Sequence, residues 1–265
     1  MLEGIIDLWF VFVILSFVFT IFDIRNTPVS WVQKLGWILV VLYTGPFGLF
    51  FYLLTCRSPG QNWHALYTQA TWKQVINSEV HCAAGDATGV ILAAIILSYT
   101  ALPMNIEVMF EYTLGFISGW IIFQAGMMRS MYKSYGESLK KTFFPEAVSM
   151  NFMMLGMIPT MIVLMTIIPE SRDPANLRFW FIMSMGALIG GIIAYPINYW
   201  LVKNKLKHGC MTLPVKMNMD KHTQHQTMQL SFTNQVVIIA LTFILLLTGI
   251  FVTYFLLPME GMQGM

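Results

Sequence analysis

The chain has 265 residues, of which 57% are hydrophobic and only 11% are charged. Soluble domains carry about 25% charged residues, so this composition excludes a soluble globular enzyme and a disordered protein. The net charge of +2 excludes nucleic acid as a partner, because binding to nucleic acid depends on many basic contacts with phosphates. We therefore expect an integral membrane protein whose main partner is the lipid bilayer.

Seven apolar segments are each long enough to cross a membrane as a helix, which takes about 20 mostly apolar residues. The apolar runs are too long, and alternate too little, for transmembrane strands. The sequence therefore predicts an all-α fold, a polytopic membrane helical bundle of seven transmembrane helices. In chain order the predicted spans are residues 4–22, 31–55, 80–100, 106–132, 146–168, 177–202 and 230–257.

Glycine and proline interrupt three of the predicted spans. Gly45-Pro46 predicts a kink in the second span. Pro159 and Pro196 each free a backbone carbonyl, in the fifth and sixth spans. We interpret the first span as a retained helix rather than a signal peptide, because no basic residue precedes its apolar run.

Lysine and arginine are unevenly distributed among the predicted loops. The loops after spans two, four and six hold eleven of them, and the loops after spans one, three and five hold four. Because cytoplasmic loops are enriched in these residues, we predict a cytoplasmic N-terminus and an external C-terminus. We divide the chain into an N-terminal transmembrane hairpin, residues 1–56, and a five-helix membrane core, residues 57–265, with a cytoplasmic loop at 203–229.

Three of the predicted spans carry two glycines one helical turn apart. Such pairs let two helix backbones approach closely, and close packing is what holds helices together in lipid. We expect spans three, four and six to form a tight bundle, although glycine is common in transmembrane helices in general. The pairs are Gly85/Gly89, Gly115/Gly119 and Gly186/Gly190.

Methionine is the most informative residue type, with 21 in the chain. At 100° per residue, the methionines of the fifth span share one helix face, within an arc of about 120°. Stacked thioethers are soft ligands that suit Cu(I), whereas a methionine stripe is also an ordinary filling for a helix interface. The face comprises Met150, Met153, Met154, Met157, Met161 and Met165.

Further methionines and two carboxylates lie beyond this face. Met104 and Met109 are at the outer end of the fourth span. Glu107 and Glu111 are beside them, where they either attract a cation or contact lipid headgroups. The C-terminal tail, where no core needs filling, adds Met259, Met262 and Met265.

The segment HCAAGD at the start of the third span combines three types of metal ligand. Cys82 and Asp86 are four residues apart and share a helix face, and His81 adjoins them. A carboxylate within a membrane span is costly and marks a functional site by default. The alternatives are an interhelical hydrogen bond for Asp86 and an interfacial position for His81. We expect all three to take part in a metal site.

A second segment after the sixth span, KHGCM at 207–211, repeats the same ligand types. His208 and Cys210 are candidate metal ligands, and they meet the first cluster if spans three and six are neighbours. The loop that follows contains His222 and His225 at a spacing of three residues. We interpret this loop as a cytoplasmic capture or release site, or as an ordinary solvated loop.

No pattern in the chain indicates enzymatic catalysis. The sequence has no GxxxxGK[ST] phosphate loop and no GxGxxG motif after a strand. It also shows no arrangement of Ser, His and Asp typical of a hydrolase. Without a nucleotide site, any transport is expected to be passive or driven by a gradient.

Four stretches together resemble a membrane family of bacteria and archaea known as domain of unknown function 4396. They are HCAAGD at 81–86, MNFMMLGMIP at 150–159, FWFIMSMGALIGGIIAYPINYWLV at 179–202 and KHG at 207–209. The resemblance covers spans three to six, about half the chain, and implies a plasma-membrane location and a fold without an established activity. Many members carry a second Cys or a small residue where this chain has Asp86. An association of some members with multicopper oxidases fits a role in copper handling.

The sequence therefore predicts a copper-handling membrane protein. Cu(I) is expected to meet Met104, Met109 and Glu107 outside, to follow the methionine face, and to leave through His81, Cys82, His208 and Cys210. The first alternative is a non-catalytic structural subunit of a larger membrane complex. The second is a proton-coupled transporter of another solute that uses Asp86 and Glu107. Possible partners are membrane-complex subunits or a copper protein.

Overall fold

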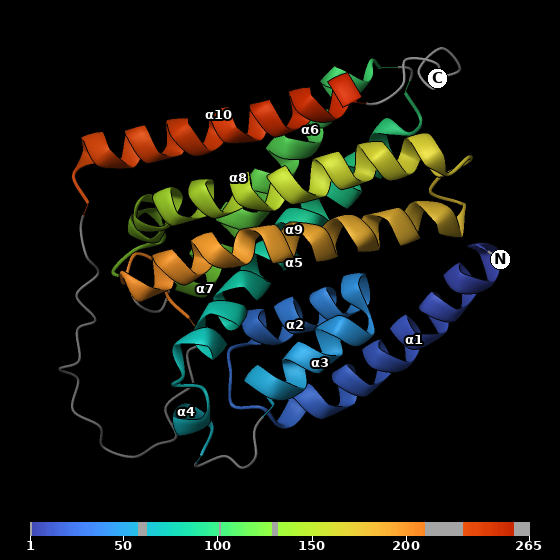
Figure 1. Ribbon diagram of the computed structural model, residues 1–265. Coiled ribbons are helices and arrows are strands. Elements are labelled where there is room, and N and C mark those ends of the chain that lie inside the picture. The colour runs from blue at the N-terminus through green and yellow to red at the C-terminus, as the bar shows by residue number, and fades with distance from the viewer. Residues whose placement is uncertain (1, 58–62, 101, 129–131, 210–229, 257–265) are drawn as a thin grey trace.

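The computed structural model describes residues 2–57, 63–100, 102–128, 132–209 and 230–256. Within these residues the protein is a bundle of helices without a β-sheet (Figure 1). Six helices are long and apolar enough to cross a membrane, which confirms the predicted all-α membrane bundle. They are α1 (Leu2–Asp23), α5 (Thr71–Leu97), α6 (Met104–Ile117) with its continuations η2 (Ser118–Ala125) and α7 (Gly126–Met128), α8 (Tyr135–Ile167), α9 (Leu177–Lys203) and α10 (Phe232–Leu256). The short helices η1 (Ile24–Asn26) and α4 (His64–Tyr67) lie between them.

The predicted second span is a hairpin of two short helices rather than one kinked crossing. These helices are α2 (Trp31–Thr44) and α3 (Pro46–Thr55), with 14 and 10 residues. Their backbones run back along each other, since a methyl group at Gly48 would lie only 3.0 Å from the Cα of Val41. At 1.5 Å of rise per residue, neither helix is long enough to cross a bilayer of about 30 Å.

The reversal takes place at Gly45. This residue ends α2 with φ of 55°, a backbone conformation that L side chains rarely adopt, and Pro46 begins α3 at its first position. A methyl group at Gly45 would also lie 2.7 Å from a methyl carbon of Val13 in α1. The Gly-Pro pair that predicted a kink therefore turns the chain back on itself.

The hairpin changes the count of crossings and so changes which helix ends share a side of the bundle. α1 begins and α10 ends at the same end of the bundle, called the terminal face here (Figure 1). The seven-crossing count and the predicted orientation, with termini on opposite sides, are therefore not confirmed. The ends of α1, α3 and α9 and the starts of α2, α5 and α8 lie at the opposite end, called the basic face here (Figure 1). These helix ends and the segments next to them carry ten of the twelve Lys and Arg residues that the structure describes: Arg25, Lys34, Arg57, Lys73, Lys133, Lys140, Lys141, Lys203, Lys205 and Lys207.

Glycines set the closest contacts between the core helices. A methyl group at Gly85 would lie 2.5 Å from the Cα of Gly119, and one at Gly89 would lie 2.6 Å from the Cα of Gly115. On α9, Gly190 is approached in the same way by the α8 backbone. The predicted tight packing of the third and fourth spans is confirmed, because only helices without side chains at these positions can approach so closely. The paired glycines of the sixth span were expected to join that bundle, but they face α8, the fifth span, instead.

The outer helices present apolar side chains to the surroundings. In α10 the only buried residue is Leu246. Asn151 of α8 donates a hydrogen bond of 2.8 Å to Thr242 of α10 and so ties this helix to the core. An apolar surface of this extent is not stable in water, and it fits the hydrocarbon interior of a bilayer.

Candidate metal centre

Three buried side chains from two helices meet near the basic face of the core. Cys82 and Asp86 lie one turn apart on α5, and Glu146 reaches them from α8. One ligand atom from each lies within 4.8 Å of the other two. The Cys82 thiol donates a hydrogen bond of 3.0 Å to a Glu146 carboxyl oxygen. A thiol and two carboxyl groups at this separation could hold a single cation.

Glu146 was not identified from the sequence. It stands at the first position of the predicted fifth span, where a carboxylate is typical of the membrane interface. The structure extends α8 back to Tyr135, so Glu146 lies well inside the helix and is fully buried. One signal in the sequence could have revealed this longer helix. Ser134 is a good N-cap residue, and a helix that begins after it includes Glu146.

Gly119 provides the space in which the two carboxyl groups face each other. A methyl group at this position would collide with a carboxyl oxygen of Asp86, and would lie 2.7 Å from one of Glu146. Gly119 belongs to η2, where the α6 helix widens into a π-helix. Such widened turns are rare and are frequently found at functional sites.

Lys207 places a positive charge inside this group. Its Nζ atom lies 2.7 Å from the Cys82 sulfur and 4.0 Å from a Glu146 carboxyl oxygen. Burial alone would lower the pKa of Lys207, but the neighbouring Cys82 and Glu146 raise it above its ordinary value. The Lys207 Nζ atom therefore competes with any metal ion for the Cys82 sulfur. Its remaining hydrogen bonds go to Ser149 and Asn198.

The two sequence segments predicted to supply ligands do meet, but through a different residue. Lys207 of the KHGCM segment contacts Cys82 of the HCAAGD segment, because α5 and α9 are neighbours. His81 is buried and lies near Gly36 of α2, outside the group formed by Cys82, Asp86 and Glu146. His208 is half-buried and is not part of that group either. Cys210 lies outside the described residues.

The methionine face of α8 lies in the interior of the protein. None of its first five members is more than 4% exposed. Several of them fill hollows over glycines: the Met153 sulfur would lie 2.9 Å from a methyl group at Gly190, and the Met161 sulfur 3.5 Å from one at Gly186. These contacts give the thioethers a packing role. The buried column consists of Met150, Met153, Met154, Met157 and Met161.

The methionine column begins beside the cluster of Cys82, Asp86 and Glu146. Met150 follows Glu146 by one turn of α8, so the two side chains are neighbours on the same helix face. The terminal methyl group of Met150 lies over Gly115, as does the backbone carbonyl oxygen of Asp86. A line of sulfur atoms therefore starts directly beside the carboxyl groups.

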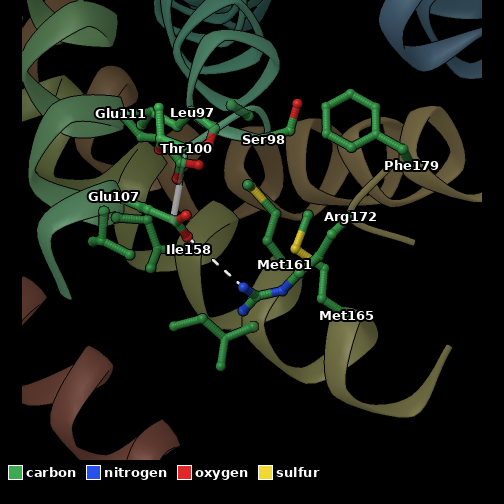
Figure 2. Close-up of a pocket in the computed structure, with 13 residues that line it drawn as sticks. Leu97, Ser98, Thr100, Glu107, Glu111, Ile158, Met161, Met165, Arg172 and Phe179 are labelled. Carbon is green, nitrogen blue, oxygen red and sulfur yellow. Dashed lines mark hydrogen bonds and ion pairs between the residues drawn. The ribbon is translucent and has the colours of Figure 1, made fainter. Parts of the chain in front are cut away.

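At the terminal face the column ends in a pocket of about 220 Å³. Figure 2 shows Met161 and Met165 beside the Arg172 guanidinium, which faces the Glu107 carboxyl group. The shortest distance between the two charged groups is 3.8 Å. Glu111 also lines the pocket and is only 9% exposed. The pocket therefore presents carboxyl and thioether groups together, and the side chain of Arg172 supplies the counter-charge.

Other methionines and histidines predicted along the path are placed elsewhere or are not described. Met109 is 65% exposed on the outside of α6 and does not line the pocket. The side chain of Met104 lies outside the described part of the chain. The same holds for His222, His225, Met259, Met262 and Met265.

Comparison with known proteins gives a family and no activity. No curated protein and no solved structure matches the chain. A family model described as a domain of unknown function matches residues 71–207. This stretch runs from the start of α5 to Lys207 and so includes the centre, the methionine column and the pocket. The chain belongs to the family defined by domain of unknown function 4396.

Proposed function

We propose that the protein carries Cu(I) across the membrane along the methionine column. The observation that carries this proposal is the order of possible metal ligands along the core. Carboxyl groups and thioethers line the pocket at one end, buried thioethers fill the middle, and a thiol with two carboxyl groups closes the other end. The ligands suit a soft monovalent cation at every level of the bundle.

Ligand chemistry favours Cu(I) over harder ions. Thioether and thiolate sulfur select Cu(I), whereas Mg²⁺ and Ca²⁺ require several oxygen ligands. A neutral thioether also binds without losing a proton, which suits an interior where an unpaired charge is costly. Single thioethers bind weakly, so the ion can move from one to the next.

Lys207 gives the centre a resting state without metal. Its Nζ atom already pairs with the Glu146 carboxyl group and contacts the Cys82 sulfur, so an arriving Cu(I) ion competes with it for Cys82. Displacement of a tethered cation lowers the affinity of the site for the metal. The ion is then released rather than trapped, as transport requires.

The distribution of basic residues supports a direction through the membrane. Cytoplasmic ends are enriched in Lys and Arg, so we infer that the basic face is cytoplasmic and that both termini are external. Cu(I) then enters at Glu107 and leaves at Cys82. The membrane is the plasma membrane of a bacterium or archaeon, and the acceptor is a cytoplasmic copper protein or chelator.

Metal binding to purified protein tests the proposal. Wild-type protein in detergent is expected to bind Cu(I), or Ag(I) as its redox-inert substitute. Cys82→Ser should lower the affinity by about 10–100-fold, because it removes the only thiol that the described residues contribute to the centre. Cys56→Ser is the matched control, since Cys56 is a buried thiol outside the centre. Equal affinity in both variants would contradict the proposal.

A structural subunit of a larger membrane complex is the second candidate. It is favoured by the way Met153 and Met161 fill hollows over Gly190 and Gly186, as packing residues do. Purification in mild detergent separates the candidates. A stable stoichiometric partner together with absence of bound metal supports the subunit, whereas metal binding by the isolated chain supports the carrier.

A further inference from the structure

A second and larger cavity, of about 570 Å³, lies outside the methionine path. It is lined by the α2–α3 hairpin on one side and by α5 and α9 on the other; Figure 1 shows the hairpin below α9. Its volume is within the range of small-molecule binding sites. Among the described residues, none that lines it belongs to the metal centre.

One charged side chain points into this apolar space. Glu79 of α5 is the only charged residue among the lining residues that the structure describes. Its side chain is 9% exposed, and one carboxyl oxygen, Oε1, is buried without a hydrogen-bond partner. Gly191 of α9 leaves room in front of it, since a methyl group there would lie 3.6 Å from that oxygen. A buried carboxyl group with an unpaired oxygen is costly unless a ligand completes it.

Aromatic rings form much of the remaining wall. Trp37, Phe47, Phe51, Trp72 and Tyr195 all line the cavity. Phe47, Phe51 and Trp72 are at least 40% exposed on the outside of the bundle, so the cavity is open toward the lipid. Aromatic faces attract cations through their quadrupole, most strongly where water is excluded.

We propose that this cavity binds a lipophilic organic cation that enters from the membrane. The carboxyl group of Glu79 supplies the counter-charge, and the aromatic rings contact the cation and its apolar body. Gly191, which has no side chain, leaves space for the ligand beside the carboxyl group. An anionic lipid is disfavoured by the carboxylate. A neutral acyl chain fills the volume but leaves the Glu79 oxygen unpaired.

Binding of tetraphenylphosphonium to the purified full-length protein tests this inference. Equilibrium dialysis should show saturable binding to wild type. Glu79→Gln should weaken it by at least about tenfold, because it removes the buried partner of the cation. Glu111→Gln is the control, since Glu111 is a similarly buried carboxyl group in the other pocket, and its affinity should equal that of wild type. Tetraphenylborate has the same shape and the opposite charge, and it should not bind.

A second pair of variants tests the space without changing the charge. Gly191→Leu should abolish binding by filling the cavity, whereas Gly191→Ala should retain it because a methyl group fits. Elution as a single species in size-exclusion chromatography identifies folded variants. Equal binding of both tetraphenyl ions, or unchanged tetraphenylphosphonium affinity in folded Glu79→Gln and Gly191→Leu protein, would overturn the inference and leave the cavity as a site for neutral lipid.

Discussion

Gly119 determines how closely Asp86 and Glu146 approach each other. Gly119→Ala introduces a methyl group that collides with one carboxyl group and crowds the other. Because the core is closely packed, we expect the variant to lose about 1–3 kcal/mol of stability. A lower temperature of thermal unfolding in detergent, together with weaker Ag(I) binding, would show both effects.

Gly136→Ala is the matched control for this prediction. Gly136 also lies in a helix, but a methyl group there meets no atom within 4 Å. Its substitution should leave stability unchanged or slightly higher, because alanine is the better helix former. Equal unfolding temperatures for the two variants would show that the glycine at 119 is not required for packing.

Lys207 is expected to hold the centre together in the absence of metal. Lys207→Met keeps an unbranched side chain but leaves Glu146 without its cation. Breaking a buried ion pair on one side costs about 3–5 kcal/mol. Ag(I) should restore stability in the variant more than it stabilises wild type, because the metal replaces the lost charge.

Thermal unfolding with and without Ag(I) measures this difference. Lys205→Met is the control, since Lys205 is exposed and should respond as wild type does. A Lys207→Met protein whose unfolding temperature does not change with Ag(I) would show that the ammonium does not occupy the position of a metal.

At the residue scale the sequence predicted part of the centre. Cys82 and Asp86 could be placed on one helix face because spacing within a helix fixes direction. Glu146 and Lys207 could not be added, because Glu146 reaches the same point from α8 and Lys207 reaches it from the segment that follows α9. His81 adjoins Cys82 in sequence, but it lies near α2, because successive residues of a helix point about 100° apart.

Among the elements, the α2–α3 hairpin distinguishes this fold from a simple bundle. Gly45→Ala forces a side chain into a backbone conformation with φ of 55° and against Val13. We expect a loss of about 1–3 kcal/mol, measured as a lower unfolding temperature. Gly4→Ala, where a methyl group meets no atom within 4 Å, should have no such effect. An unchanged Gly45→Ala protein would mean that the turn is not strained.

Hydropathy predicted the long helices and failed at the hairpin for a definite reason. It sums apolar residues over a window and does not register direction, so 25 apolar residues that reverse at Gly45 resemble one span. The Gly-Pro pair is compatible with a kink and with a reversal. The choice depends on tertiary contacts such as that between Gly48 and Val41.

For the whole molecule, the hairpin makes a prediction about topology. Six crossings place both termini on the same side of the membrane, whereas seven place them on opposite sides. Short epitope tags fused to either end should therefore be accessible from the same side of intact cells. Antibody access before and after permeabilisation of the cells measures this. Two tags that are accessible from opposite sides of the membrane would contradict six crossings and support seven.

Transport through the methionine column is the central claim, and uptake into proteoliposomes tests it most directly. Cu(I) accumulation should be saturable with wild-type protein, and Met153→Leu/Met157→Leu should lower it by at least about tenfold, because leucine keeps the packing volume but removes the sulfur. Met109→Leu, which alters an exposed methionine outside the pocket, should transport as wild type does. Wild-type rates of uptake by the folded double variant would contradict the account.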